Sequence, residues 1–270
     1  MNMFNLKGKV AVITGGYGVL GASMARCLAA NGVHVVIVGR KPEKGEALAK
    51  ELTTLGTEAL FCKADVLDRE ALVAAREEIV GKWGHLDILI NAAGGNMPGA
   101  TIMPDKSFLD IDFSAFGDVV NLNLMGTVIP TVVFGEQMAK QKYGSIINIS
   151  SMTAQSVVTR VVGYSASKSA IDNFTRWMAV EMAKKVGEGV RVNAIAPGFF
   201  ITEQNRTLMT NPDGSLSDRA KDVVRATPFG RLGEAEELHG AVIFYASDAS
   251  KFVTGTILPI DGGFSIFSGV

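Results

Sequence analysis

Tyr164 and Lys168 are the residues whose types and spacing most directly suggest chemistry. They stand four residues apart in a stretch with a helical pattern, so we expect their side chains on one face of a helix. A phenol with a pKa of about 10 exchanges protons poorly at neutral pH, and a neighbouring ammonium lowers that pKa. Ser151 follows a predicted strand, Ser145–Ser150, which places its hydroxyl to face the phenol. These three residues predict an acid–base site for a reacting oxygen atom.

A glycine-rich segment directly after the first predicted strand, Val10–Thr14, indicates a nucleotide site. From Gly16 it has the pattern G-x-G-x-x-G, and it opens a predicted helix, Ala22–Asn31. Glycines let the backbone approach a pyrophosphate closely, and a helix N-terminus offers N–H groups and a positive dipole end. Strand, turn and helix in this order predict dinucleotide binding. The residues of this turn expected to contact the dinucleotide are Gly15, Gly16, Tyr17, Gly18, Val19 and Leu20.

The residues after the second predicted strand, Val33–Val38, bear on the choice of coenzyme. A site selective for NAD commonly has Asp or Glu here, which accepts a hydrogen bond from the ribose 2′-hydroxyl. This chain has Gly39-Arg40-Lys41 instead. A guanidinium binds a 2′-phosphate through charge-assisted hydrogen bonds, so Arg40 and Lys41 favour NADP(H) and leave NAD(H) as the alternative. In a plainer interpretation, both side chains only solvate a loop.

Short β-branched runs alternate with helical patterns along the whole chain, which predicts βαβ crossovers and a parallel sheet. The runs are apolar almost throughout, as expected of strands covered on both faces. We therefore predict an α/β fold: a single Rossmann-type, doubly wound domain over residues 1–270, with a seven-stranded parallel sheet and helices on both faces. The predicted strands are Val10–Thr14, Val33–Val38, Ala59–Lys63, Ile88–Asn91, Ser145–Ser150, Val190–Ala196 and Thr256–Ile260.

Two long segments, 94–115 and 199–228, interrupt this alternation. Each follows a predicted strand at its carboxyl end, where open α/β sheets bind ligands. Long loops at such places are commonly functional, and plain surface loops are the alternative. We expect both segments to contact the substrate.

The composition argues against several functional classes. Of 270 residues, 47% are hydrophobic and 20% are charged, which is typical of a folded globular chain. The 26 basic and 27 acidic residues give a net charge of −1, so neither nucleic acid nor a membrane is expected as a partner. Two cysteines and three scattered histidines have no metal-site spacing, so no metal is expected. The chain shows no secretory signal and no run of apolar residues long enough to span a membrane, so a cytoplasmic location is expected.

Several motifs in a fixed order give the chain a resemblance to the short-chain dehydrogenase/reductase family over essentially its full length. They include the glycine turn, Ser151 and Tyr164-x-x-x-Lys168. The other matching segments are Asp65-Val66, Asn91-Ala92-Ala93-Gly94, Asn123 within Asn-Leu-Met-Gly, Pro197-Gly198 and Asp261-Gly262-Gly263. The chain departs from the family at one point, because the family's turn commonly has glycine where this sequence has Val19.

The resemblance implies a catalytic set of Asn123, Ser151, Tyr164 and Lys168. Tyr164 would be the general acid and base, and Ser151 would hydrogen-bond the reacting oxygen. Lys168 would hold the nicotinamide ribose and lower the pKa of the tyrosine, and Asn123 would support a proton-relay water. By the same resemblance, the further coenzyme contacts are Asp65, Val66, Asn91, Ala92, Ala93, Gly94, Tyr164, Lys168, Pro197, Gly198 and Thr202.

A closer resemblance is to bacterial short-chain fructuronate reductases, also called D-mannonate oxidoreductases. It rests on segments such as 196–206 and 227–231. It implies reduction of D-fructuronate at C5 to D-mannonate. A sugar acid needs hydrogen-bond partners for its hydroxyls and a cation for its carboxylate. The candidate substrate contacts are Asn96, Ser151, Arg160, Tyr164, Gln204, Asn205 and Arg206.

Three alternatives stay open beside this hypothesis. One is another polyol or keto-acid reductase, such as an enzyme like gluconate 5-dehydrogenase. Met97, Met103 and the segment 199–201 keep a more apolar substrate, such as a steroid or an acyl thioester, among the alternatives. A third is a non-enzymatic NADP-binding sensor, against which the intact serine and tyrosine argue. The family resemblance also implies a homotetramer.

Overall fold

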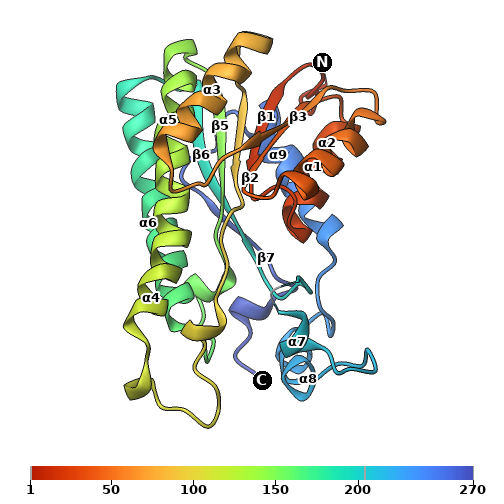
Figure 1. Cartoon of the computed structure of the whole chain (residues 1–270), viewed down its shortest axis with the longest axis vertical. Helices are drawn as coiled ribbons and strands as arrows, with labels where there is room; N and C mark the ends of the chain where they lie inside the picture. The colour runs from red at the N-terminus through yellow and green to blue at the C-terminus, as the bar shows by residue number, and fades with distance from the viewer. Residues whose placement is uncertain (1, 204, 270) are drawn as a thin grey trace.

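A seven-stranded parallel sheet forms the centre of the molecule (Figure 1). The structure is a computed structural model and describes residues 2–203 and 205–269. The strand order is β3-β2-β1-β4-β5-β6-β7, which confirms the predicted Rossmann-type sheet. The observed ends of each strand agree with the predicted run to within one residue. The strands are β1 (Val10–Thr14), β2 (His34–Gly39), β3 (Ala59–Lys63), β4 (Ile88–Asn91), β5 (Gly144–Ile149), β6 (Val190–Pro197) and β7 (Ile257–Ile260).

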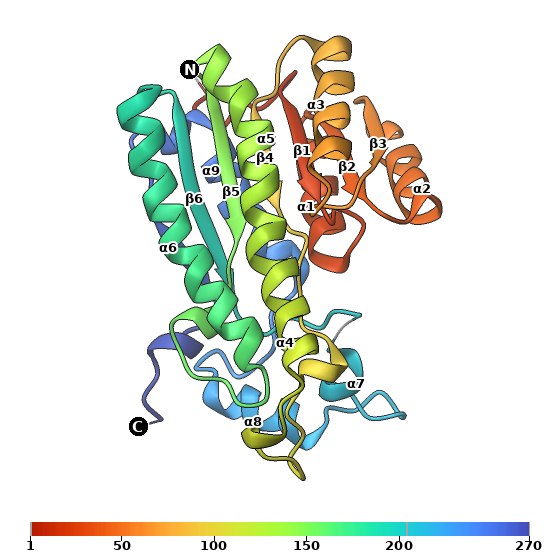
Figure 2. The ribbon, with the colours of Figure 1, turned by 60° about the vertical axis from the view of Figure 1, so that its left-hand side comes forward.

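Helices cover both faces of the sheet because the strands bury side chains on both sides. Ala11 and Ile13 of β1 belong to one apolar cluster, whereas Val10 and Val12 belong to the other. Helices α1, α2 and α9 lie on the first face, and α3, α5 and α6 lie on the second (Figure 1 and Figure 2). Their bounds are α1 (Val19–Ala30), α2 (Pro42–Thr53), α9 (His239–Ala246), α3 (Arg69–Trp83), α5 (Gly126–Gln141) and α6 (Val162–Lys185).

The helix after the glycine turn begins earlier than predicted. It starts at Val19 rather than Ala22, because Gly18 takes the extended conformation of an N-cap (φ −71°, ψ 165°). Gly15, at φ +62°, makes the turn before it. Glycine adopts this left-handed conformation without the steric cost of a Cβ. The turn therefore brings the N-terminus of α1 directly to the carboxyl end of β1.

One long helix on the second face contains a wide turn. A π-helical turn, Asn121–Met125, joins α4 (Phe113–Val120) to α5. The continuous helix, Phe113–Gln141, is long and apolar enough to cross a membrane by length and composition. Its α5 part packs against α3, β4 and β5, with Phe134 fully buried. This is the ordinary environment of a core helix in a doubly wound fold.

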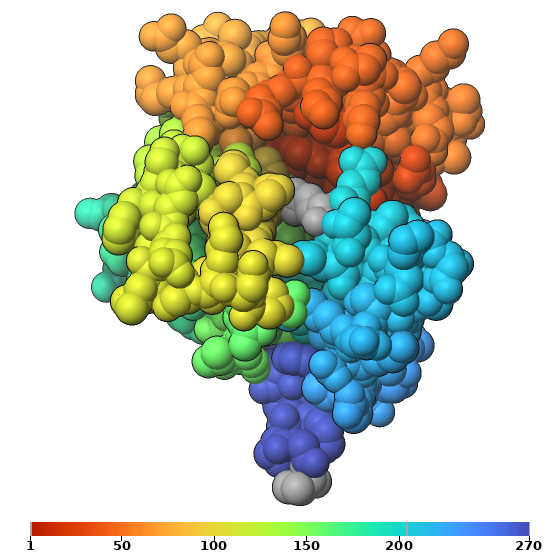
Figure 3. Space-filling view, turned by 60° about the horizontal axis from the view of Figure 1, so that its bottom comes forward, coloured from red at the N-terminus to blue at the C-terminus, as the bar shows by residue number. Residues whose placement is uncertain are grey.

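The two segments predicted to contact the substrate lie beyond the carboxyl ends of the strands. The first, 94–115, holds short 3-10 turns before α4 begins, and the second, 199–228, holds α7 (Arg206–Met209) and α8 (Asp218–Ala226). Figure 3 shows a hollow between them. The 3-10 turns of the chain are Pro98–Ala100, Phe108–Asp110, Met152–Ala154, Ala235–Leu238, Asp248–Ser250 and Phe264–Ile266.

A chain of buried polar side chains crosses the centre of the sheet. Asn91 Nδ2 on β4 donates to Asn148 Oδ1 on β5 and to Thr131 Oγ1 on α5, at 2.9 Å each. Asn148 Nδ2 in turn donates to Thr175 Oγ1 on α6 at 2.9 Å. All four side chains are buried, where polar groups without partners are costly. These hydrogen bonds therefore fix α5 and α6 against the sheet. They position the helix that carries the predicted acid–base pair.

Replacing Asn148 with Ala should lower the free energy of unfolding by about 2–4 kcal/mol, because two buried hydrogen bonds are lost and their partners stay buried. Urea denaturation followed by circular dichroism measures this loss. Asn173→Ala, which removes an exposed side chain from α6, is the control and should change the free energy by no more than about 0.5 kcal/mol. Equal values for the two variants would contradict the structural role of the polar chain.

Candidate active site

A cavity of about 570 Å³ runs from the glycine turn, past the carboxyl ends of β4, β5 and β6, to the second loop. It opens at the hollow seen in Figure 3. It brings together most of the residues predicted for coenzyme binding and catalysis. The predicted residues on its wall are Gly15, Gly18, Val19, Leu20, Ala92, Gly94, Asn96, Ser151, Tyr164, Lys168, Pro197, Gly198, Thr202 and Asn205.

Other predicted residues do not line this cavity. Within the described residues these are Gly16, Tyr17, Arg40, Lys41, Asp65, Val66, Asn91, Ala93, Asn123, Arg160 and Arg206. Gln204 lies outside the described residues. Asn91 has the structural role given above, Val66 is buried, and Ala93 donates its backbone N–H to Thr14 Oγ1 at 3.2 Å. The described residues contain no group of three or more His, Cys, Asp or Glu that could hold a metal ion.

Tyr164 and Ser151 meet inside the cavity. Tyr164 lies in the first turn of α6, is partly buried, and is hydrogen-bonded to the side chain of Ser151. Ser151 follows β5 and is buried, and its Oγ accepts the backbone N–H of Thr153 at 3.2 Å. Burial raises the pKa of Tyr164, and the hydrogen bond with Ser151 lowers it by less. The phenol is therefore protonated at neutral pH and can act as a proton donor.

Lys168 lies one helical turn after Tyr164 and is almost fully buried. Its Nζ donates to the carbonyl oxygen of Ile149 at 2.6 Å and lies 5.4 Å from the centroid of the Tyr164 ring. Burial lowers the pKa of Lys168 to about 8, and the carboxylate of Asp172 acts in the opposite direction. From sequence we expect this ammonium to lower the pKa of Tyr164. The pKa of Tyr164 is raised instead, because burial of the phenol outweighs its hydrogen bond with Ser151.

Asn123 lies in the π-helical turn and is fully buried. Its Oδ1 accepts the N–H of Gly95 at 2.9 Å, and its Nδ2 donates to the carbonyl oxygens of Gly95 at 2.7 Å and Val119 at 2.8 Å. The side chain therefore ties the start of the first loop to the long helix. Both amide hydrogens are used, so only the oxygen is left to offer a water. The support of a relay water stays a prediction.

The glycine turn fits a pyrophosphate for steric reasons. A Cβ on Gly15 would lie 2.8 Å from Ala93 Cα, and one on Gly21 would lie 2.7 Å from the Gly15 carbonyl oxygen. Gly18, the N-cap of α1, has no side chain to cap the first turn, so the N–H groups there are directed at an approaching anion. Val19 is the first residue of α1 and lines the cavity, so the departure from the family turn is accommodated inside the helix.

Four residues predicted to bind the coenzyme, Tyr17, Arg40, Lys41 and Asp65, meet near the end of β2. Tyr17 OH accepts the backbone N–H groups of Arg40 at 3.1 Å and of Lys41 at 3.3 Å. The exposed guanidinium of Arg40 lies 3.6 Å from Asp65 Oδ2. The guanidinium of Arg40, the carboxylate of Asp65 and the phenol of Tyr17 thus lie near one another at the end of β2.

Two amide side chains predicted to bind substrate differ in how much of their hydrogen-bonding capacity is used. Asn205 uses its amide within its own loop, since Oδ1 accepts from Thr202 N at 2.7 Å and Nδ2 donates to the Phe200 carbonyl oxygen at 2.8 Å. Asn96 Nδ2 donates to Thr101 Oγ1 at 2.7 Å. The Oδ1 atom of Asn96 is buried and has no partner among the described residues. Asn96 is therefore the better candidate for binding a hydroxyl.

Arg219 is an arginine of the cavity that sequence reasoning missed. It is the second residue of α8 and lines the cavity, whereas Arg160 and Arg206 do not. Its guanidinium donates to the Thr159 carbonyl oxygen at 3.2 Å and to Thr159 Oγ1 at 3.4 Å, and it forms no ion pair with any described residue. Burial and the nearby charge of Arg160 lower the pKa of Arg219. A signal was present, because Arg219 precedes buried Val223 by four residues and so shares its helical face.

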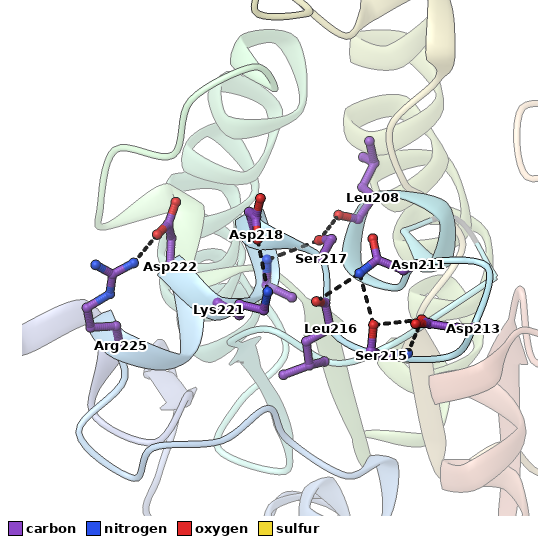
Figure 4. A network of polar contacts seen from close by, with 11 residues as sticks. Leu208, Asn211, Asp213, Ser215, Leu216, Ser217, Asp218, Lys221, Asp222 and Arg225 are labelled. Atoms are coloured by element: carbon purple, nitrogen blue, oxygen red, sulfur yellow. Dashed lines mark hydrogen bonds and ion pairs between the residues drawn. The ribbon is translucent and has the colours of Figure 1, made fainter.

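The segment before α8 is held by its own polar contacts (Figure 4). Ser217 Oγ donates to the Leu208 carbonyl oxygen at 2.6 Å and accepts the N–H of Ala220 at 3.2 Å, which caps α8. Asn211 Nδ2 donates to Ser215 Oγ at 3.0 Å across the preceding turn. These contacts join α7 to α8 and determine where the first turn of α8 begins.

The buried ammonium of Lys168 predicts a pH-dependent stability. A lysine whose pKa is lower in the folded protein than in the unfolded chain is destabilising while charged, and this cost disappears as the pH rises. The pKa of Lys168 is about 8 against an ordinary 10.5. The free energy of unfolding of the wild type relative to Lys168→Met should therefore rise by up to about 3 kcal/mol across that pH window.

Urea denaturation at a series of pH values between 8 and 10.5 measures this rise. Lys184→Met, which removes an exposed lysine from the same helix, controls for the substitution itself. A difference between wild type and Lys168→Met that does not change with pH would show that the ammonium is not desolvated as described.

Comparison with known proteins agrees with this geometry. The profile of the short chain dehydrogenase family matches residues 9–213. The uncharacterized oxidoreductase UxuB of Bacillus subtilis is 46% identical over 275 residues, which cover 98% of each chain. The crystal structure of a proposed D-mannonate oxidoreductase from Haemophilus influenzae with bound NAD superimposes with a TM-score of 0.91 at 42% identity, over 98% of both chains.

A second solved structure is similar over the same length. It is a gluconate 5-dehydrogenase from Burkholderia cenocepacia in complex with NADP and tartrate, with a TM-score of 0.86 at 32% identity over 98% of both chains. The family match, the identities and the full-length superpositions lead to one conclusion. The chain belongs to the short-chain dehydrogenase/reductase family of NAD(P)-dependent oxidoreductases.

Proposed function

We propose that the protein interconverts a ketone and a secondary alcohol of a sugar acid, with D-fructuronate and D-mannonate as the pair. The observation that carries the proposal is that Tyr164 and Ser151 share one cavity with the guanidinium of Arg219. A proton donor and an anion-binding group in one cavity suit a substrate that has both a carbonyl and a carboxylate. The D-mannonate oxidoreductase and gluconate 5-dehydrogenase relatives support the same substrate class.

Tyr164 moves the proton in this reaction. In the reducing direction its phenol donates a proton to the carbonyl oxygen, and Ser151 hydrogen-bonds that oxygen; in the oxidising direction the phenolate takes the proton back. A bound nicotinamide dinucleotide supplies the hydride for reduction or accepts it in oxidation. The raised pKa of Tyr164 keeps the phenol protonated until it reacts, which suits reduction.

The remaining groups hold the coenzyme. The N-terminus of α1 holds the pyrophosphate, Lys168 holds the nicotinamide ribose, and Pro197, Gly198 and Thr202 border the nicotinamide. The cationic side chains at 40 and 41 favour NADP(H) over NAD(H) by attracting a 2′-phosphate.

The initial rates of NADPH and NADH oxidation with D-fructuronate test the proposal, with 5-ketogluconate as the comparison substrate. We expect rapid turnover of D-fructuronate and slow turnover of 5-ketogluconate. The reverse order would favour an enzyme like the gluconate 5-dehydrogenase of Burkholderia cenocepacia, which is the second candidate. Inactivity with both acids would overturn the sugar-acid assignment.

In the same assay, Tyr164→Phe should lower kcat by about 10²–10⁴-fold, because the proton donor is removed and the ring is kept. Tyr143→Phe is the matched control, since Tyr143 does not line the cavity, and it should retain its kcat. A kcat close to wild type in Tyr164→Phe would exclude this residue as the proton donor.

We further propose that Arg219 binds the substrate carboxylate. Arg219→Gln should then lower kcat/KM for D-fructuronate by about 10- to 100-fold, which is the range for loss of charge-assisted hydrogen bonds. For the uncharged methyl ester of the substrate, the same substitution should lower kcat/KM much less. Arg225→Gln is the control, because Arg225 lies on the same helix, pairs with Asp222 and does not line the cavity. Equal losses for acid and ester would mean that Arg219 acts only through its contact with Thr159.

A homotetramer and a cytoplasmic location stay predictions. Exposed apolar side chains on α4, α5 and α6 support an association of these helices with another subunit. They are Phe113, Val132, Trp177 and Val180.

A further inference from the structure

The ring of Tyr17 lies over Gly39 at the end of β2. A Cβ built on Gly39 would lie only 2.3 Å from Tyr17 Cε1 and 3.0 Å from its hydroxyl oxygen. A side chain at position 39 and the ring of Tyr17 therefore exclude each other. Position 39 is where an acidic residue would accept a hydrogen bond from the ribose 2′-hydroxyl. In this chain a phenol occupies the space of that carboxylate.

The hydroxyl of Tyr17 also uses the donors of the neighbouring backbone. It accepts the N–H groups of Arg40 at 3.1 Å and Lys41 at 3.3 Å. Lys41 is the N-cap of α2, and its side chain makes no capping hydrogen bond. These N–H groups would otherwise face an anion at the end of β2. The hydroxyl of Tyr17, which is a neutral acceptor, binds these N–H groups instead.

The size of the group at the 2′ position distinguishes the two coenzymes at this point. A hydroxyl that accepts two N–H groups still has its own proton to donate, and the ribose 2′-hydroxyl of NAD(H) can accept it. A 2′-phosphate can accept the same proton, but it is bulkier, so it reaches the backbone donors only after the phenol has moved away. The carboxylate of Asp65, 3.6 Å from the guanidinium of Arg40, further offsets the attraction of that cation for a phosphate.

We propose that Tyr17 is a coenzyme-selecting residue: its phenol occupies the 2′-phosphate position and lowers the affinity for NADP(H) relative to NAD(H). It opposes the attraction that the side chains of Arg40 and Lys41 exert on a 2′-phosphate. The ratio of the two affinities is thus the balance between a steric block and a cationic attraction. The inference rests on the coenzyme class of the proposed function and not on its substrate.

Isothermal titration calorimetry tests this without any turnover. The titrants are NADH, NADPH and the fragments 5′-ADP and 2′,5′-ADP, each added to the coenzyme-free protein. In Tyr17→Ser, the ratio of the Kd for NADPH to the Kd for NADH should fall at least about tenfold, because the charge-assisted hydrogen bonds of the phosphate become accessible. The ratio of the Kd for 2′,5′-ADP to the Kd for 5′-ADP should fall in parallel.

Two further variants separate the two contributions. Tyr17→Phe keeps the ring over Gly39 and removes only the hydroxyl acceptor, so its ratio should fall less than that of Tyr17→Ser. Arg40→Gln removes the cation and keeps the phenol, so its ratio should rise. Tyr17→Leu keeps apolar packing at this partly buried position and repeats the test if the serine variant folds poorly.

An unchanged ratio in folded Tyr17→Ser or Tyr17→Leu would overturn the proposal. Failure of the wild type to bind either dinucleotide would contradict this inference and the coenzyme class of the proposed function together. Tight dinucleotide binding and the expected ratios without turnover of any sugar acid would support the inference and contradict only the proposed substrate.

Discussion

The arrangement of the site depends above all on the hydrogen bond from Lys168 Nζ to the carbonyl oxygen of Ile149, at 2.6 Å. It joins the middle of the second turn of α6 to the last residue of β5. Tyr164 lies one turn before the lysine and Ser151 two residues after the carbonyl, so this contact, together with the hydrogen bond from Asn148 to Thr175, holds the two side chains near each other. Burial disfavours the charge of this ammonium, and for this reason the pKa of Lys168 is lowered to about 8.

The two walls of the cavity are held in place by different kinds of contact. On the sheet side, polar side chains inside the core, including Asn148 and Asn123, connect strands, helices and the first loop. The second loop is held mainly by contacts within itself, such as those of Ser217 and Asn211. Tyr164 and Ser151 therefore stand on the wall that is joined to the core, and Arg219 stands on the wall formed by the second loop.

The sheet and the acid–base pair were predictable because they follow from local patterns. Runs that are apolar throughout identify buried parallel strands, and a four-residue spacing identifies one helical face. The place of Arg219 and the contacts of Tyr17 were not predictable from the sequence. Each depends on where an irregular segment or turn places a side chain in space. The pairing of Tyr17 with Gly39 joins residues that are distant in sequence, and only the geometry of neighbouring strands brings them into contact.

Because of the π-helical turn Asn121–Met125, the number of residues in the long helix is constrained. Each residue of an α-helix rotates the chain by about 100°, so deleting one residue here would turn Asn123 away from Gly95 and release the first loop. Insertions and deletions should therefore be absent from the long helix in functional relatives. The exposed turn 211–215, whose contacts are local, can change in length without moving the sheet wall. Length variation among relatives is therefore expected on the side of the cavity that carries Arg219, where it leaves Tyr164 in place.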